Sequence, residues 1–180
     1  MLPLGTPMPE FELPDVVTGH RISSKDFHKN TGILVMFICA HCPYVIHLQH
    51  ALAKLGNDYS GGKLTMVAIS ANDAKNYPDD APDQLKAMAE ELNFQFPYCY
   101  DQTQDTARAF TAACTPDFFL FNSSRRLVYR GQFDETRPGK GIPTGSDLRN
   151  AIDALLAGNI VSADQKPSVG CNIKWKSPVS

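Results

Sequence analysis

The sequence lacks a long apolar run, a strong excess of charge of either sign, and internal repeats. No apolar run in its 180 residues is long enough to cross a bilayer. The formal net charge is −2, which gives no electrostatic reason to expect binding to nucleic acid or to an anionic membrane surface. The N-terminus has no basic segment followed by an apolar stretch, so we expect no signal peptide. These absences favour a soluble protein that binds neither nucleic acid nor membrane.

Cysteine is also scarce, because the chain has five, an odd number, with a single close pair. This usage does not fit the disulfide framework of a small secreted protein, so we expect a cytoplasmic location. The length and the 43% hydrophobic content are enough for one domain with a sizeable core. No linker-like stretch divides the chain. We therefore expect a single domain over 1–180, with its core over about 5–157 and a tail over 158–180.

The close pair, Cys39 and Cys42, lies between an expected strand and an expected helix. The preceding run, 33–38, is short, continuous and rich in branched and aromatic residues, which is typical of a buried parallel strand. Apolar residues then recur at helical spacing, at Val45, Leu48, Leu52 and Leu55. The two cysteines are therefore expected at a helix N-terminus.

A helix N-terminus favours a thiolate, because unpaired backbone N–H groups and the helix dipole give it partial positive charge. Such a thiolate is a nucleophile near neutral pH, and two cysteines at this spacing can close a disulfide. We predict that Cys39 is the exposed attacking sulfur and that Cys42 resolves the mixed disulfide. His41 lies between them, and a cationic imidazole there would lower the pKa of Cys39 further.

Half of a zinc site is the main alternative interpretation of such a pair, but zinc would need a second pair of ligands. The remaining cysteines, Cys99, Cys114 and Cys171, are scattered singly. The strand-to-helix context is the one that a redox motif requires. We therefore expect neither a metal nor an organic cofactor.

Outside this motif, hydrophobic patterning and turn residues predict the remaining elements of an α/β chain. The short links around the first helix predict a right-handed crossover, with parallel pairing of 33–38 and 63–70. The expected elements are an N-terminal hairpin over 15–22, strands over 63–70, 96–101, 117–122 and 126–131, and helices over 83–92, 104–110 and 147–156.

Three segments resemble the thioredoxin superfamily. The strand, the Cys39–Pro43 motif and the helix after it form one, and the opening 5–15 resembles the AhpC/TSA branch of peroxiredoxins and thiol-specific antioxidant proteins. Thr115-Pro116 followed by 117–121 resembles the cis-proline loop and next strand of thioredoxins. The resemblance covers about 5–157. It implies a thioredoxin-like α/β fold with a central mixed sheet flanked by helices and an N-terminal hairpin extension.

The resemblance also implies a substrate-docking edge. In the family, the residue before the cis-proline offers its backbone to an incoming peptide beside the redox pair. Thr115 and Pro116 are therefore expected to dock the substrate, a protein or small-molecule thiol or disulfide. Two nearby questions stay open: Cys114 is either a packed loop residue or redox-active, and Cys171 is either a third redox cysteine or an ordinary thiol.

The chain departs from both family patterns. Thioredoxins have a buried Asp where Ile33 stands, and Gly-Pro where Ala40-His41 stands. A His there is found in strongly oxidising relatives, so we expect a less reducing potential than the thioredoxin value of about −270 mV. Peroxiredoxins would place the peroxidatic cysteine at Cys42, but they have Thr where Cys39 stands and an Arg where this chain has Pro116-Asp117.

Three functions follow in order of preference. The first is a thiol–disulfide oxidoreductase that uses the Cys-Ala-His-Cys pair. The second is a peroxiredoxin-like thiol peroxidase that reduces hydroperoxides. The third is a non-catalytic binding module with the same fold, against which the intact cysteine pair argues. The sequence defines neither the partner nor the oligomeric state.

Overall fold

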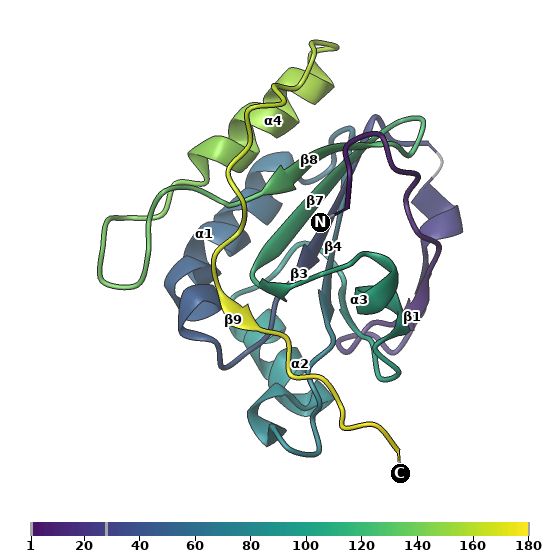
Figure 1. The fold of residues 1–180 in the computed structure, drawn as a ribbon, viewed down its shortest axis with the longest axis vertical. Helices are drawn as coiled ribbons and strands as arrows, with labels where there is room; N and C mark the ends of the chain where they lie inside the picture. The colour runs from purple at the N-terminus through teal and green to yellow at the C-terminus, as the bar shows by residue number, and fades with distance from the viewer. Residues whose placement is uncertain (1, 28, 180) are drawn as a thin grey trace.

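The computed structural model describes residues 2–27 and 29–179. A five-stranded mixed sheet with the order β5-β4-β3-β7-β8 is its centre (Figure 1). The strands are β3 (Gly32–Phe37), β4 (Leu64–Ser70), β5 (Tyr98–Tyr100), β7 (Asp117–Asn122) and β8 (Leu127–Gly131). β3 pairs parallel with β4 and antiparallel with β7. The predicted central strand and its parallel partner are therefore confirmed.

Three helices cover one face of the sheet. They are α1 (Pro43–Tyr59), α2 (Pro82–Glu91) and α4 (Ser146–Leu156). Buried side chains from these helices form one apolar cluster with Leu34 and Met36 of β3. Because all six residues of β3 are buried, a second layer must cover the opposite face as well.

That second layer consists of the N-terminal segment and the short helix α3 (Asp105–Ala109). Phe37 of β3 lies edge-to-face with Phe110, at a centroid distance of 5.4 Å, and Phe110 contacts Phe11 from the N-terminal segment at 6.1 Å. Aromatic packing of this kind fixes the N-terminal segment on the sheet. The fold is the thioredoxin-like arrangement that the sequence predicts.

The N-terminal extension contains the expected hairpin. β1 (Glu12–Pro14) and β2 (Arg21–Ser23) pair antiparallel and are followed by a 3-10 turn, η1 (Ser24–Phe27). The Asp15 carboxylate accepts hydrogen bonds from the Val17 amide inside the turn. The hairpin is therefore closed by its own side chains as well as by strand pairing.

The C-terminal segment crosses the molecule as a long strap. Figure 1 shows it in yellow, running from α4 past the ends of β8 and α1 toward α2. Its short strand β9 (Cys171–Asn172) pairs antiparallel with β6 (Cys114–Thr115), and Ile173 beside it is buried. The sequence pattern did not predict this strand, because two residues carry no periodic signal.

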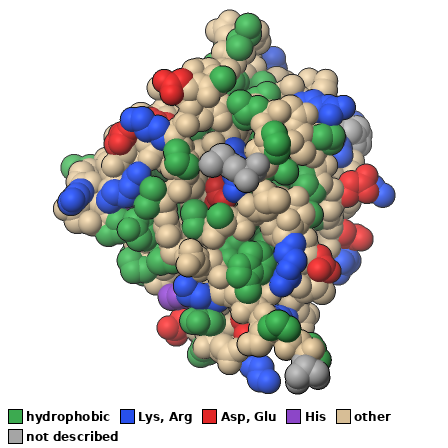
Figure 2. Space-filling view, viewed as in Figure 1, with side chains coloured by type: hydrophobic (Ala, Val, Ile, Leu, Met, Phe, Trp, Pro, Cys, Tyr) green, Lys and Arg blue, Asp and Glu red, His purple; other side chains and the backbone are tan. Residues whose placement is uncertain are grey.

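The surface gives little indication of a charged partner. On the face drawn in Figure 2, acidic and basic side chains are interspersed with apolar ones. Within residues 2–27 and 29–179, no helix combines the length and the hydropathy that a membrane span needs.

Candidate active site

The cysteine pair lies in the loop that connects β3 to α1. Pro43 begins the helix, where a missing N–H costs nothing, and Cys42 is its N-cap with an extended backbone, φ −67° and ψ 126°. Cys39 and Cys42 are both 0% exposed. The expectation that Cys39 is an exposed sulfur is therefore wrong, whereas Cys42 lies at the helix N-terminus as expected.

Cys42 Sγ is the central sulfur of the site. It is hydrogen-bonded to Cys171 Sγ at 2.8 Å, and it lies 3.3 Å from the carbonyl oxygen of Thr115, to which the neutral thiol donates. A hydrogen bond from the Cys39 thiol lowers the pKa of Cys42 to about 4, with further contributions from Cys171 and from the Val45 amide in the first helical turn. Cys42 therefore favours the thiolate form.

Cys39 has the opposite tendency. Its hydrogen bond to Cys42 raises the pKa of the Cys39 thiol, and burial and the negative charge of Asp80 raise it further. The proton shared by the pair therefore stays on Cys39. The sequence predicts an acidic thiol at Cys39, whereas these contacts favour the thiolate at Cys42.

Asp80 organises the loop around Cys39. It ends a 3-10 turn, η2 (Pro78–Asp80), and is 0% exposed. Its carboxylate accepts hydrogen bonds from the amides of Ala40 at 2.8 Å and His41 at 3.1 Å, and from the Asn72 side chain at 2.8 Å. The sequence analysis did not single out Asp80. Its only local signal is an acidic residue in the loop that follows β4, whose carboxyl end lies beside that of β3.

His41 also binds Asp80, through Nδ1. Its ring lies parallel to that of Tyr77, with a centroid distance of 6.0 Å and an interplanar angle of 11°. Any positive charge on the imidazole is therefore paired with a buried carboxylate next to Cys39. The predicted role of His41 in setting the thiol pKa stays a prediction.

Ligand-type atoms of Cys39, His41 and Asp80 lie within 4.8 Å of one another. Cys42 does not belong to this group. Both Asp80 oxygens already accept hydrogen bonds from the protein, and His41 Nδ1 is bound to one of them. This set of side chains therefore offers too few free ligand atoms to fit a structural zinc ion.

The Thr115–Pro116 peptide bond is cis, and the loop lies beside the cysteine pair as expected. Thr115 Oγ1 is 3.5 Å from Cys39 Sγ, while its carbonyl oxygen faces Cys42. The backbone edge of Thr115 pairs with Cys171 of β9. The edge expected to dock a substrate is thus covered by the chain's own C-terminal segment.

The two remaining cysteines are buried, and each has a raised pKa of about 12, mainly because burial disfavours the thiolate. Cys99 belongs to β5. The Cys114 thiol donates to the carbonyl oxygen of Pro116 at 3.6 Å. Protonated, buried thiols of this kind are typical of packing residues.

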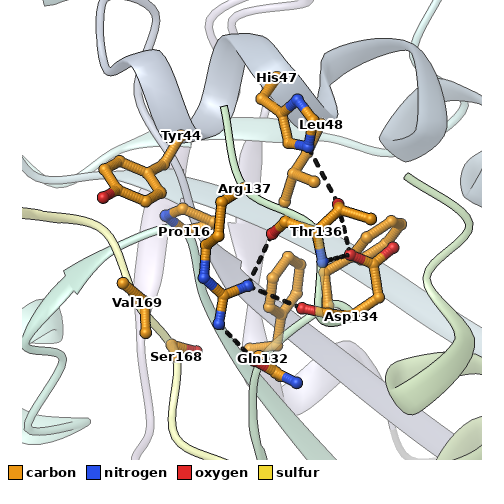
Figure 3. A pocket seen from close by; sticks show the side chains of 12 residues that line it. Tyr44, His47, Leu48, Pro116, Gln132, Asp134, Thr136, Arg137, Ser168 and Val169 are labelled. Atoms are coloured by element: carbon orange, nitrogen blue, oxygen red, sulfur yellow. Dashed lines mark hydrogen bonds between the residues drawn. The ribbon is translucent and has the colours of Figure 1, made fainter. Parts of the chain in front are cut away.

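A hollow lies on the other side of Pro116, between α1 and the loop after β8 (Figure 3). Its polar side chains are bonded mainly to one another: Arg137 donates to Gln132 Oε1 at 2.7 Å, and Thr136 Oγ1 is 2.9 Å from His47 Nε2. The hollow is lined by Tyr44, His47, Leu48, Pro116, Phe118, Gln132, Phe133, Asp134, Thr136, Arg137, Ser168 and Val169. The hollow is therefore lined by side chains that are hydrogen-bonded to one another rather than by free charges.

Comparison with known proteins shows the family and the fold. Residues 4–130 match the model of the AhpC/TSA family. An uncharacterised conserved protein from Geobacillus kaustophilus is 50% identical to this chain, with a TM-score of 0.95. The match covers 100% of this chain and 95% of the Geobacillus chain. A hypothetical protein from Sinorhizobium meliloti is 45% identical, with a TM-score of 0.95, and the match covers 98% of this chain and 97% of the Sinorhizobium chain. No curated protein matches the sequence.

A more distant structure shares the fold. The thioredoxin domain of a thiol-disulfide oxidoreductase from Bacteroides vulgatus is 20% identical with a TM-score of 0.62, covering 83% of this chain and 97% of its own. At this identity the likeness shows a thioredoxin-like fold.

Proposed function

The chain belongs to the AhpC/TSA family, and from that premise we propose that it is a thiol–disulfide oxidoreductase whose redox pair is Cys39 and Cys42. Family and fold support oxidoreductase chemistry in general terms. The observation that carries the finer proposal is the state of the pair: Cys42 is the N-cap of α1, and a hydrogen bond from Cys39 lowers the pKa of Cys42 to about 4. One sulfur is thus prepared to attack and the other to resolve.

The reaction proceeds in two exchanges. The Cys42 thiolate attacks a substrate disulfide, forming a mixed disulfide and releasing the first substrate sulfur as a thiolate. Cys39 then loses its proton and attacks Cys42 Sγ, which closes the Cys39–Cys42 disulfide and releases the second substrate sulfur. The two electrons of the pair end on the two substrate sulfurs; the Cys39 proton goes to one of them, and solvent protonates the other. In the reverse direction the protein oxidises a dithiol.

The surrounding groups have supporting roles. Asp80 fixes the loop that carries Cys39 and His41, and its charge keeps Cys39 protonated until the second exchange. When Cys42 is protonated, its thiol donates to the Thr115 carbonyl beside the cis-proline loop. The substrate is a thiol or disulfide, and the chemistry of the site calls for neither a metal nor an organic cofactor.

A thiol peroxidase is the second candidate, because the acidic sulfur is Cys42, the position that the peroxiredoxin resemblance assigns to the peroxidatic cysteine. The partner groups argue against it. The Arg130 guanidinium donates to Asp117 at 3.3 Å and to the Thr111 carbonyl at 2.8 Å, so it is committed to other acceptors. A peroxide bound at Cys42 would lack this cation.

Steady-state assays with oxidised glutathione and with hydrogen peroxide, each with dithiothreitol as the electron donor, distinguish the two functions. We expect turnover with the disulfide, loss of turnover in Cys42→Ser and in Cys39→Ser, and little change in Cys99→Ala, which removes a buried thiol in β5. Peroxide turnover exceeding disulfide turnover would favour the second function.

The order of attack is tested by trapping. Because Cys171 also contacts Cys42, the trapping variant is Cys39→Ser with Cys171→Ser, which leaves Cys42 without a resolving thiol. We expect this protein to retain glutathione on Cys42. The opposite result would be glutathione retained on Cys39 in a Cys42→Ser protein and none retained on Cys42 in the double variant. It would show that Cys39 attacks first, as the sequence predicts.

A further inference from the structure

The C-terminal strand β9 occupies the place of an incoming peptide. In β6–β9 pairing, Thr115 is opposite Cys171 and Cys114 is opposite Asn172, in antiparallel register. The resemblance implies that an incoming peptide pairs with the backbone of the residue before the cis-proline, as an added strand does. Here the added strand comes from the same chain, and the residue opposite Thr115 is itself a cysteine.

Gly170 permits the close approach of this strand. A Cβ atom at this position would lie 2.0 Å from the Thr115 carbonyl oxygen and 3.2 Å from Pro116 Cδ. A glycine is therefore required for the strand to lie against the cis-proline loop. The backbone before Cys171 fits this edge and no side chain separates the two.

The strand brings a sulfur into contact with the redox pair. Cys171 Sγ is hydrogen-bonded to Cys42 Sγ at 2.8 Å, closer than the contact of Cys42 with the Thr115 carbonyl. Cys39 and Cys42 are wholly buried, whereas Cys171 is half-buried. Cys42 thus has one thiol neighbour in the interior and one toward the surface.

Anchors on both sides hold Cys171 in place. Before it, the Ser168 hydroxyl donates to the Gly131 carbonyl at 2.6 Å. After it, the Lys174 amide donates to Asn72 Oδ1 at 2.8 Å, and the Lys174 carbonyl accepts from the Asp73 amide at 2.9 Å. A thiol held in this way has a high effective concentration at Cys42.

We propose that the C-terminal strand is a built-in substrate and that Cys171 is a third redox cysteine, which exchanges with Cys42. The proposal rests on the proposed function, since it takes the oxidised Cys39–Cys42 pair as its starting state. The Cys171 thiolate attacks Cys42 Sγ, a Cys42–Cys171 bond forms, and the Cys39–Cys42 bond breaks with Cys39 as the leaving thiolate. The proton that Cys171 loses is balanced by the one that Cys39 gains, and no external oxidant is consumed.

This exchange moves the disulfide from the interior to the surface. Cys39 is a suitable acceptor of the proton, because burial and the negative charge of Asp80, which do not depend on a reduced Cys42, raise the pKa of its thiol. The Cys42–Cys171 disulfide includes the sulfur of a half-buried residue, whereas both residues of the Cys39–Cys42 disulfide are wholly buried. Thiols therefore exchange with the protein at Cys171.

The test maps disulfides in variants oxidised with diamide, which accepts the two electrons. In Cys39→Ser, peptide mapping is expected to find an intramolecular Cys42–Cys171 disulfide, and Cys39→Ser with Cys99→Ala is expected to give the same bond. The bond is lost in Cys39→Ser with Cys171→Ser. In the wild type, a mixture of Cys39–Cys42 and Cys42–Cys171 is expected.

Oxidised Cys39→Ser protein in which Cys171 stays a free thiol, while Cys42 forms intermolecular disulfides, would overturn the proposal. Turnover of oxidised glutathione by the wild type separates this failure from that of the proposed function. Turnover without a Cys42–Cys171 bond overturns only the proposal that Cys171 is a third redox cysteine. A Cys42–Cys171 bond without turnover supports the sulfur contact and overturns the proposed function.

Discussion

Which of Cys39 and Cys42 holds the proton decides how the site reacts. Cys42 combines the helix N-terminus with a thiol donor at Cys39, while Cys39 is buried next to the charge of Asp80. Both effects move the negative charge to Cys42. In the proposed function, Cys42 at the helix N-terminus is therefore the nucleophile, and Cys39 resolves the mixed disulfide.

The thiolate of Cys42 is directly measurable. Because the pKa of Cys42 is lowered from 9.0 to about 4, the ultraviolet absorbance of a thiolate should persist at neutral pH in reduced protein and be lost in Cys42→Ser. Cys99→Ala should leave it unchanged. A single transition near pH 9 in the wild type would contradict the assignment.

The same shift makes the stability of the reduced protein depend on pH. Since the pKa is lower in the folded state, the thiolate contributes its full stabilisation above about pH 9 and loses it as pH falls through about 4. The difference in unfolding free energy between wild type and Cys42→Ser should therefore decrease on acidification across this window. Urea unfolding at several pH values measures it, and a difference independent of pH would contradict it.

Asp80 is the residue whose loss should disturb the loop most. Asp80→Asn replaces one acceptor oxygen by a donor group, which leaves buried donors of Ala40, His41 or Asn72 without a partner. We expect a loss of about 1–3 kcal/mol in urea unfolding. Asp79→Asn, at the exposed neighbouring position, should cost little. Equal effects of the two variants would show that Asp80 does not organise the loop.

The residues of the site were only partly predictable from the sequence. Cys39 and Cys42 have a local spacing that indicates their chemistry. Asp80 and Cys171 carry no such spacing, since each reaches the pair through a separate segment of chain. The sequence also could not show which sulfur favours the thiolate, because this depends on burial and on contacts that only the folded chain makes.

At the scale of elements, strong periodic patterns predicted well. The expected strand over 63–70 corresponds to β4 (Leu64–Ser70), and the expected helix over 147–156 to α4 (Ser146–Leu156). β9 was not predicted, because its two residues become a strand only by pairing with β6. Short strands that depend on distant partners lie beyond pattern analysis.

Gly170→Ala should detach β9 from the cis-proline loop. The added Cβ would overlap the Thr115 carbonyl oxygen, so the strand must shift, and we expect a cost of about 1–3 kcal/mol. Cys42 should then react faster with iodoacetamide, because its cover is displaced. Mass spectrometry of the labelled peptide measures the rate.

Gly62→Ala is the matched control, since a Cβ there meets the nearest atom, the Tyr59 carbonyl oxygen, at 3.4 Å, an ordinary contact. Its labelling rate at Cys42 should equal that of the wild type. Equal rates in Gly170→Ala and the wild type would show that β9 does not limit access to Cys42.

At the scale of the whole molecule, the C-terminal segment covers the backbone edge of Thr115 that is expected to dock a substrate, because β9 pairs with it. The family match covers residues 4–130 and thus the redox pair and the cis-proline loop, while the segment that closes the site lies beyond it. Thiol chemistry in the interior is thereby separated from the solvent by one short strand. We expect small thiols and disulfides to exchange more readily than folded proteins while this strand is in place.

Redox titration of the wild type against glutathione buffers, with disulfides mapped at each point, tests the central claim most directly. Stabilisation of the Cys42 thiolate favours the reduced form, so the account predicts a reversible two-electron couple that involves Cys42, is absent in Cys42→Ser, and has a potential less negative than about −270 mV. A protein in which Cys42 forms no reversible disulfide across these buffers, or whose couple lies at or below that potential, would contradict it.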